Sequence, residues 1–175
     1  MKPFTIDRLA EFYFCSDTIV GWQYVFTSPA MFNVIIDSLK FCSSKKGLRL
    51  HGYVIMPNHI HSIVSARDGN LSDILRDFKR FTSDKISERL LNKRLDKYFA
   101  SAARREGKGN VHKVWQRGSH PEAIVSQEFF LQKLNYIHEN PVRKGYVRQP
   151  EHWLYSSARN YLLNDDAVIR IDKLG

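Results

Sequence analysis

The order of strand-like and helix-like segments predicts an α+β fold, an antiparallel β-sheet with helices on one face in the ferredoxin-like layout. The segments alternate as strand, helix, strand, strand, helix, strand and helix. The two central strands are separated only by Pro57-Asn58, so they form an antiparallel hairpin, which disfavours a doubly wound parallel sheet. A chain of 175 residues is most simply a single domain, spanning 1–175.

The first half of the chain supplies the hairpin and one helix. Aromatic and β-branched residues predict a strand over residues 12–20 and a second one over 22–26. Apolar residues at helical spacing predict a helix over 30–46. Strands are expected over 48–56 and 60–66, on either side of the proline-containing turn.

The second half begins with an amphipathic helix over residues 71–91, because apolar residues recur there every three or four positions. Residues 92–112 are polar and rich in Gly, Lys and Arg, which predicts a mobile loop. Strands are expected around Trp115 and over 123–125.

The C-terminal part is predicted to hold one long helix and two minor elements. Ser126 is a suitable N-cap for a helix that runs to about residue 139, and Pro141 is expected to end it. A short helix over 153–161 and a weak strand over 168–171 complete the chain.

The charge balance favours a polyanionic partner. Lys and Arg number 27 against 18 Asp and Glu, a net charge of +9 with a pI near 9.6. The 76–117 stretch holds 13 of the basic residues and 5 of the acidic ones. Such a run is often only a solvated surface, but here it predicts a groove for a nucleic-acid backbone, with Trp115 stacking on a base. The predicted backbone contacts are Arg76, Lys79, Arg80, Lys113 and Arg117.

Several other protein classes are disfavoured. No apolar run approaches the roughly 18 residues of a membrane span, and the N-terminal residues do not have the pattern of a signal peptide, so we expect no membrane partner and a cytoplasmic location. Cys15 and Cys42 are too few and too far apart for a disulfide framework or a thiolate zinc site, and they are expected to be small buried hydrophobes.

The hairpin carries the first candidate for chemistry, the pair His59 and His61. Alternate residues of a strand share a face, so the two imidazoles point the same way, while Ile60 and Ile63 are expected to bury the reverse face. Two neutral imidazoles form half of a divalent-metal site with open positions. The alternative is two surface histidines on a half-exposed strand.

The second candidate lies on the predicted helix that follows Ser126. Tyr136 and Asn140 are four residues apart and therefore one turn apart on the same side. The Asn140 amide oxygen would suit Mg²⁺ or Mn²⁺ as a third ligand, and Tyr136 would then stand next to whatever the ion polarises, as an oxygen nucleophile. The alternative is that Tyr136 packs in the core.

Three separated motifs, together with the segment that follows them, resemble single-tyrosine HUH transposases, and most of all the REP-associated tyrosine transposase branch. The motifs are Gly52-Tyr-Val-Ile-Met-Pro-Asn-His-Ile-His61, Val114-Trp-Gln116 and Asn135-Tyr-Ile-His-Glu-Asn-Pro-Val-Arg-Lys-Gly145, followed by Trp153-Leu-Tyr-Ser-Ser157. The resemblance spans roughly residues 12–161 in matching order.

The resemblance implies both a fold and an activity. It implies the HUH endonuclease fold with the histidine pair on a central strand, His59 and His61 as metal ligands, Tyr136 as nucleophile and Asn140 completing the metal shell. Such enzymes use Mg²⁺ or Mn²⁺ to cleave single-stranded DNA, often beside a hairpin, and leave a 5′-phosphotyrosine and a free 3′-hydroxyl. They occur as monomers and as dimers, so a homodimer stays open.

We therefore expect a transposase that nicks and rejoins single-stranded or hairpin DNA. Two other functions are compatible with the same residues. One is a regulator that binds nucleic acid on the same fold without cutting it. The other is a metal phosphodiesterase in which water, rather than Tyr136, attacks the phosphate.

Overall fold

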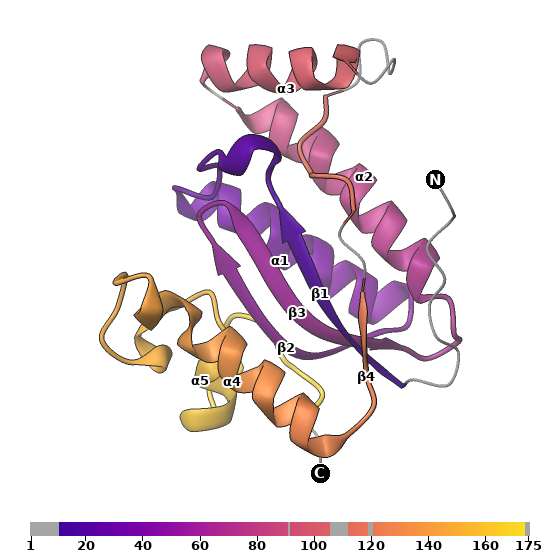
Figure 1. Cartoon of the computed structure of the whole chain (residues 1–175), viewed down its shortest axis with the longest axis vertical. Helices are drawn as coiled ribbons and strands as arrows, with labels where there is room; N and C mark the ends of the chain where they lie inside the picture. Colours follow the sequence, from indigo (N-terminus) through magenta and orange to yellow (C-terminus); the bar gives the residue numbers. More distant parts are fainter. Residues whose placement is uncertain (1–10, 91, 106–111, 119–120, 174–175) are drawn as a thin grey trace.

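The computed structural model describes residues 11–90, 92–105, 112–118 and 121–173, and its centre is a four-stranded antiparallel sheet (Figure 1). The strands are β1 (Phe12–Thr18), β2 (Leu48–Met56), β3 (His59–Ala66) and β4 (Glu122–Ile124). They lie in the order β2-β3-β1-β4. Strand β3 therefore lies between β1 and β2, although β1 and β2 follow one another in the chain. This strand order is the ferredoxin-like topology that the sequence predicts.

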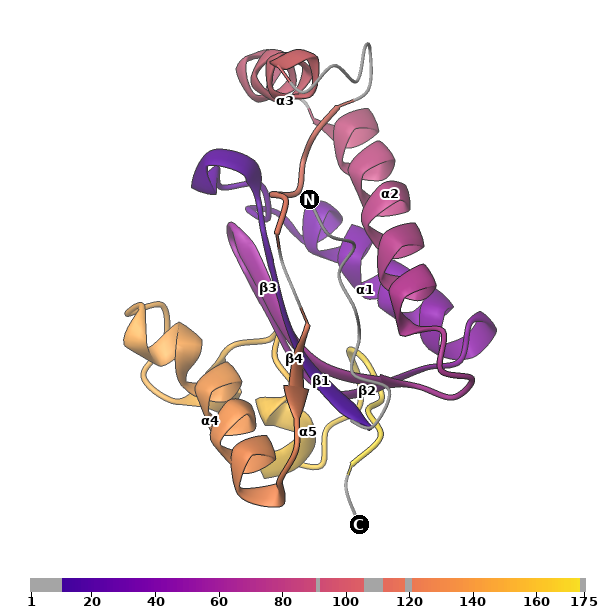
Figure 2. The ribbon, with the colours of Figure 1, turned by 45° about the vertical axis from the view of Figure 1, so that its right-hand side comes forward.

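Helices cover both faces of this sheet, so the prediction of helices on one face was wrong (Figure 2). On one side lie α1 (Pro29–Lys45) and α2 (Leu71–Arg89), and on the other α4 (Gln127–Arg143) and α5 (Ala158–Leu162). The physical reason is visible in β2 and β3, which are buried along almost their whole length, as expected for strands covered on both faces.

Each face of the sheet has its own apolar layer. The larger layer, under α1 and α2, includes Tyr13, Cys15 and Ile60. The smaller layer joins Phe14 and Ile63 to three residues of α4, namely Phe130, Leu134 and Ile137. Cys15 and Cys42 are both buried and unpaired with each other, as the sequence predicts.

The alternation along β3 decides what faces α4. Ile60 lies in the larger layer and thus buries the face opposite His59 and His61, as expected. Ile63 was expected to join it but lies in the α4 layer. Residues 59, 61 and 63 have the same parity, so all three must project from the same face of the strand.

Helix α4 approaches the sheet closely at Gly52. A β-carbon at this position would lie 2.7 Å from Cδ1 of Leu134, so the absence of a side chain allows the approach. The ladder between β2 and β3 shifts register between Leu50 and Gly52, which leaves His51 as a bulge. Gly52 and Leu134 therefore determine how closely α4 packs on the sheet.

Several local predictions need correction. The predicted loop contains a helix, α3 (Lys93–Arg105), and its remaining part at 106–111 lies outside the described residues. Pro141 does not end α4, which continues to Arg143, because a proline in the last turn removes only one late hydrogen bond. Residues 23–26 form no strand, and 3-10 turns occupy Val20–Trp22 and Pro150–His152.

Three more elements are shorter than expected or absent. Trp115 makes only an isolated bridge with Ile19, and residues 168–171 form no strand. The predicted helix over 153–161 begins only at Ala158. The other helices and strands agree with their predicted positions to within a few residues, and Ser126 caps α4 by accepting a hydrogen bond from the Phe129 backbone amide, 3.1 Å.

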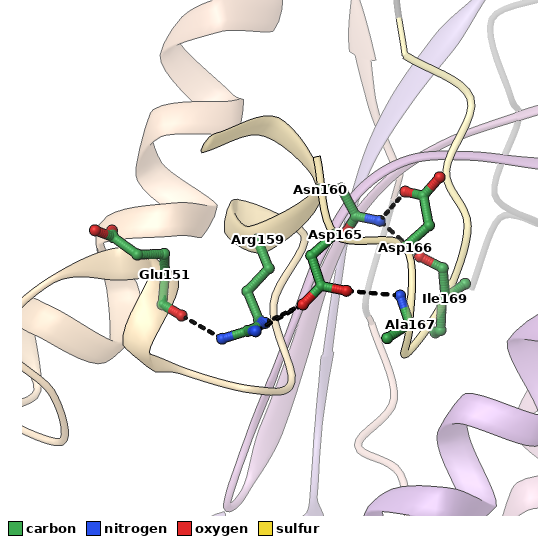
Figure 3. Close-up of polar contacts among 7 residues, drawn as sticks. All are labelled: Glu151, Arg159, Asn160, Asp165, Asp166, Ala167 and Ile169. Atoms are coloured by element: carbon green, nitrogen blue, oxygen red, sulfur yellow. Dashed lines mark hydrogen bonds and ion pairs between the residues drawn. The ribbon is translucent and has the colours of Figure 1, made fainter. Parts of the chain in front are cut away.

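The C-terminal segment covers the free edge of β2. The backbone of Ser157 donates to the Tyr53 carbonyl, and the Asp172 amide donates to the Leu50 carbonyl, 2.9 and 2.8 Å respectively. Between these points, two side-chain interactions fix the segment. The Arg159 guanidinium forms an ion pair with Asp165, and the side-chain amide of Asn160 donates hydrogen bonds to the Asp166 carboxylate and to the Ile169 carbonyl (Figure 3). The paired edge cannot recruit a further strand without displacing this segment.

Among the helices of the described residues, none has both the length and the apolar composition needed to cross a bilayer.

Candidate catalytic site at the histidine pair

The site is built where the start of β3 meets α4. The His59 and His61 rings project from the same face of β3, with centroids 4.8 Å apart and planes at 67°. Both side chains are buried under α4. His61 is stacked on Phe14 of the neighbouring strand β1, with 5.4 Å between the ring centroids. The alternative of two surface histidines therefore does not hold.

Both imidazoles are neutral at physiological pH. Burial, together with the charge of Lys144, lowers the pKa of His59 to about 4. Burial, followed by the neighbouring His59 and the charges of Arg143 and Lys133, lowers the pKa of His61 to about 3. A neutral imidazole keeps a lone pair on one nitrogen, which is the state that a metal ion requires.

Asn58 orients the first histidine. Its side-chain oxygen lies 2.7 Å from Nδ1 of His59, so that nitrogen carries the proton and Nε2 keeps the lone pair. The Asn58 amide nitrogen donates to the Trp22 carbonyl, 3.3 Å, which ties the turn before the α1 helix to the histidine strand. A hydrogen-bonded partner of this kind is typical of metal-binding histidines.

Two buried polar atoms at the site have no hydrogen-bond partner in the described part of the chain. They are Nδ1 of His61 and the side-chain oxygen of Asn140. Asn140 is buried on α4, and its side chain lies close enough to the His59 ring to raise the pKa of that ring slightly as a weak acceptor, against the larger effect of burial. Unsatisfied buried atoms are costly unless something binds them, and an imidazole nitrogen with an amide oxygen is a donor set that fits a divalent ion.

No group of three or more His, Cys, Asp or Glu side chains suited to a metal exists within the described ranges. A metal site here consequently depends on an amide as its third protein ligand. The residues fit an ion with open coordination positions, such as Mg²⁺ or Mn²⁺, better than they fit a closed structural zinc site.

Tyr136 stands beside this pair. Its ring meets the His61 ring edge-on at 67°, with 5.3 Å between centroids, and it also contacts Phe14 at 6.0 Å. The side chain is 42% exposed, whereas Leu134 and Ile137 on the same helix are buried. Packing in the core, the alternative for Tyr136, is therefore wrong, and its ring is both close to the histidines and open to solvent.

Three cations surround the site, and the sequence reasoning passed over all of them. The Arg143 guanidinium lies 4.5 Å from the centroid of the Tyr136 ring and donates to the Tyr136 carbonyl at 2.8 Å. Lys133 lies over the Phe14 ring and bonds Glu122 at 2.6 Å, and Lys144 follows α4 next to His59. Helical spacing could have found two of them, since Lys133 and Arg143 are one and two turns from Tyr136.

The predicted backbone-binding residues on α2 are not brought to this site. Arg76, Lys79 and Arg80 belong to a helix on the opposite face of the sheet (Figure 2). Lys79 is held by the buried carboxylate of Asp17 at 2.6 Å, and Arg76 by Asp73 at 2.6 Å. A continuous groove from these cations to the histidines would have to pass around the sheet.

The remaining predicted DNA contacts lie on the segment beside the end of β1. Lys113 and Arg117 flank Trp115 in the sequence. The backbone N–H of Gln116 donates to the Thr18 carbonyl at 2.8 Å and fixes this segment beside β1. Trp115 itself is only 5% exposed, packs against Phe26 and Phe78, and donates from Nε1 to Thr82 Oγ1 at 2.9 Å. The prediction that it stacks on a base was wrong, because its ring is part of the core.

Two further histidines, His138 and His51, have structural partners. Nε2 of His138 lies 2.9 Å from Ser157 Oγ, and that hydroxyl also accepts from the Tyr53 amide. The His51 ring bonds Ser65 Oγ and the Asp172 carbonyl. Neither belongs to the site.

Comparison with known proteins identifies the family. The family model described as "Transposase IS200 like" matches residues 23–118, more than half of the chain. A Haemophilus influenzae protein, named as a candidate REP-associated tyrosine transposase, is 33% identical over 107 residues. This match covers 59% of the chain and 54% of that relative, so the chain spans about half the length of the curated relative it matches.

One solved structure supports the fold. The structure of a REP-associated tyrosine transposase bound to a REP hairpin has a TM-score of 0.62 and 20% identity, and the match covers 100% of this chain and 92% of that one. A candidate transposase from Deinococcus radiodurans matches at a TM-score of 0.46 and 18% identity over 80% of this chain and 97% of its own. Because the family model matches more than half of the residues of this chain, the chain belongs to the IS200-like transposase family.

Proposed function

We propose that the chain is a metal-dependent DNA strand transferase that nicks and rejoins single-stranded DNA through Tyr136. The observation that carries this proposal is the position of the half-exposed Tyr136 ring against a buried, neutral histidine pair, 5.3 Å from His61. A phenol open to solvent next to metal-ligating groups is what a tyrosine nucleophile needs.

In this proposal His59, His61 and Asn140 hold one Mg²⁺ or Mn²⁺ ion. Support comes from the Asn140 oxygen and the His61 Nδ1, which are buried without a hydrogen-bond partner among the described residues, and from pKa values that keep both imidazoles neutral. When bound, such an ion draws electron density from a phosphate oxygen and makes the phosphorus a better target for attack.

Tyr136 would supply the attacking oxygen. Its Oη forms a bond to phosphorus while the bond from phosphorus to the 3′ oxygen of the preceding nucleotide breaks. The phenol loses its proton and the departing oxygen gains one, so charge and protons balance. The products are a 5′-phosphotyrosine and a free 3′-hydroxyl, which can attack the same linkage in reverse and reseal the strand.

The cations around the site would neutralise the phosphate. Arg143 lies against the Tyr136 ring, and its charge acts on His61, as does that of Lys133. Fixed positive charges close to the reacting phosphorus favour the more negative transition state. In this proposal Arg143 and Lys133, and not the cations of α2, contact the scissile phosphate.

We further propose that the DNA presents a hairpin next to the cleaved strand. A REP hairpin is bound by the transposase whose structure matches this chain over its whole length. The net charge of +9 supports a nucleic-acid partner.

Covalent capture tests the proposal. The protein is incubated with Mn²⁺ and a hairpin oligonucleotide that has a single-stranded flank, labelled at the 3′ end in one sample and at the 5′ end in another. A 5′-phosphotyrosine retains only the fragment on the 3′ side of the cut, so the 3′ label should migrate with the protein and the 5′ label should not.

The Tyr136→Phe variant separates the alternatives. It should form no adduct and should not cut the DNA. Cleavage that survives in this variant would show that water attacks, as in a phosphodiesterase. Tight hairpin binding by the wild-type protein with neither cleavage nor adduct would indicate a regulator that only binds.

A further inference from the structure

An exposed aromatic surface lies next to the histidine pair, and the proposed chemistry does not use it. Trp22 is 59% exposed, Tyr24 is 58% exposed and Tyr146 is 41% exposed. The indole of Trp22 meets the His59 ring at 6.1 Å between centroids, and the hydroxyls of Tyr24 and Tyr146 lie 3.5 Å apart. We call Trp22 and Tyr24 the aromatic platform.

The backbone holds Trp22 outward at an energetic cost. Its φ is 57°, in the left-handed region that bulky residues rarely adopt, and Gly21 before it has a φ of 64°. The turn is closed by a hydrogen bond from the Trp22 amide to the Ile19 carbonyl, 2.9 Å. Strain that is maintained by surrounding structure occurs most often at functional sites.

Other elements keep this turn in place. Any β-carbon on Gly21 would collide with the hydroxyl end of Tyr98, so a side chain of α3 covers the turn. Asn58 donates to the Trp22 carbonyl and accepts from His59, so the same side chain positions the platform and a proposed metal ligand. The platform is thus rigidly connected to the candidate site and is not an exposed loop tip.

A pocket continues beyond Tyr24. It has a volume of about 490 Å³ and lies between Gln23, Tyr24 and the start of α3, where Arg94 and Tyr98 contribute. Arg94 is exposed and has no ion-pair partner within the described ranges, unlike the α2 cations Arg76 and Lys79. Flat exposed aromatic rings followed by an available guanidinium are the combination that binds unpaired bases and their phosphates.

We propose that the aromatic platform stacks unpaired nucleobases of a single DNA strand and that Arg94 contacts the backbone of that strand. The inference rests on the proposed function for the identity of the strand, namely the one that passes through the site at His59 and His61. The stacking itself needs neither metal nor Tyr136. The duplex stem of a hairpin cannot use the platform, because its bases are already stacked on one another.

The test measures equilibrium binding of a fluorescent oligo(dT) strand in EDTA, on a Tyr136→Phe background, so that no cleavage can occur. Trp22→Gly should weaken binding about tenfold, since stacking on one aromatic ring has an effect of that order. Trp22→Phe keeps a ring and should stay within about threefold of the parent protein. Phe41→Ala is the matched control, because Phe41 is 54% exposed on α1 across the sheet, and it should not change the affinity.

Glycine at position 22 also separates stacking from structure. It relieves the left-handed conformation, so the variant should be at least as resistant to heat as the parent while binding DNA less well. Equal affinity in a folded Trp22→Gly protein would overturn the proposal. A second measurement needs no variant to fold: binding of oligo(dT) should quench Trp fluorescence in the parent protein, and unchanged fluorescence at saturation would also overturn it.

The DNA side of the contact can be removed as well. An abasic position moved along the oligonucleotide should weaken binding to the parent protein at one or two positions, and it should cause no further loss in Trp22→Gly. Arg94→Ala should reduce the slope of log affinity against log salt by about 0.7, the value for one phosphate contact with a single strand. A platform that works while covalent capture fails would refute only the proposed chemistry, and the reverse result only the platform.

Discussion

Tyr136 of helix α4 lies edge-on against His61 of strand β3 within one and the same chain, with 5.3 Å between ring centroids. The contact exists because α4 packs on the face of the sheet from which residues 59, 61 and 63 project. It brings a solvent-accessible phenol to a buried pair of neutral imidazoles. The predictions below follow from this arrangement and from the packing that maintains it.

The first prediction is that Tyr136 acts on the histidine pair of its own chain. A mixture of Tyr136→Phe and His59→Ala proteins should form no covalent adduct with hairpin DNA, because each chain lacks one part of its own site. The adduct is measured as a DNA-dependent shift in denaturing electrophoresis. Adduct formation in the mixture would mean that two copies of the chain share a site.

The second prediction concerns Asn140. Because its side-chain oxygen is buried without a partner among the described residues, replacing it with Ala should weaken Mn²⁺ binding by tenfold or more, as measured by calorimetric titration. Asn135→Ala removes an exposed amide from the same helix and should leave the Mn²⁺ affinity unchanged. Equal Mn²⁺ affinity in Asn140→Ala and Asn135→Ala would remove Asn140 from the proposed ligand set.

The third prediction is a pH dependence of stability that involves His138. Burial lowers the pKa of His138 to about 4, against 6.5 for an exposed histidine. Above pH 6.5 neither the folded nor the unfolded state is protonated there, so the contribution is independent of pH. Between pH 6.5 and 4 the unfolded state binds a proton that the folded state does not, so the free energy of unfolding should fall by up to about 1.4 kcal/mol per pH unit from this group.

Urea unfolding at a series of pH values measures this effect. The His138→Gln side chain cannot bind the proton. The slope of its free energy of unfolding against pH should therefore be smaller than in the wild type, by up to about 1.4 kcal/mol per pH unit. A variant whose stability falls with pH as steeply as the wild type would mean that His138 is accessible to protons in the folded state. His152→Gln, which replaces an exposed histidine, serves as the control.

The fourth prediction tests the close approach of α4 to β2. Gly52→Ala places a methyl group 2.7 Å from Leu134 Cδ1, so the leucine must move, and we expect a loss of about 1–3 kcal/mol in the free energy of unfolding. In the double variant with Leu134→Ala, the loss in the free energy of unfolding should be smaller than the sum of the losses in the two single variants. The smaller side chain at position 134 leaves space for the new methyl group. Strict additivity would show that the two residues do not meet.

The fifth prediction concerns Trp115. Its Nε1 donates to Thr82 inside the core. Trp115→Phe should lower the free energy of unfolding by about 1–3 kcal/mol, because Thr82 Oγ1 loses the hydrogen bond that it accepts, while keeping the one that it donates to Phe78, and because the core loses volume. Binding of oligo(dT) by the folded variant should be the same as in the wild type. A selective loss of DNA affinity with unchanged stability would restore Trp115 as a base-stacking residue.

Much of the fold follows from local patterns in the sequence. The period of two along β3 places His59 and His61 on one face whatever packs against it, and the helical period places Tyr136 and Asn140 one turn apart. The Pro57-Asn58 turn makes the hairpin antiparallel. These features depend on residues a few positions apart, so they can be predicted without knowledge of the rest of the chain.

Tertiary packing decided what those patterns could not. Whether α4 or α2 covers the histidine face depends on contacts between residues far apart in the chain. The charge pattern alone therefore places the basic residues of α2 in a nucleic-acid groove and gives no role to Lys133 and Arg143. The same holds for the aromatic residues. Trp115 and Trp22 are both tryptophans next to polar residues in the sequence, but one is enclosed by Phe26 and Phe78, and the other is held outward by the turn beneath α3. Burial is a property of the assembled layers, because a side chain becomes inaccessible only when a distant element packs over it.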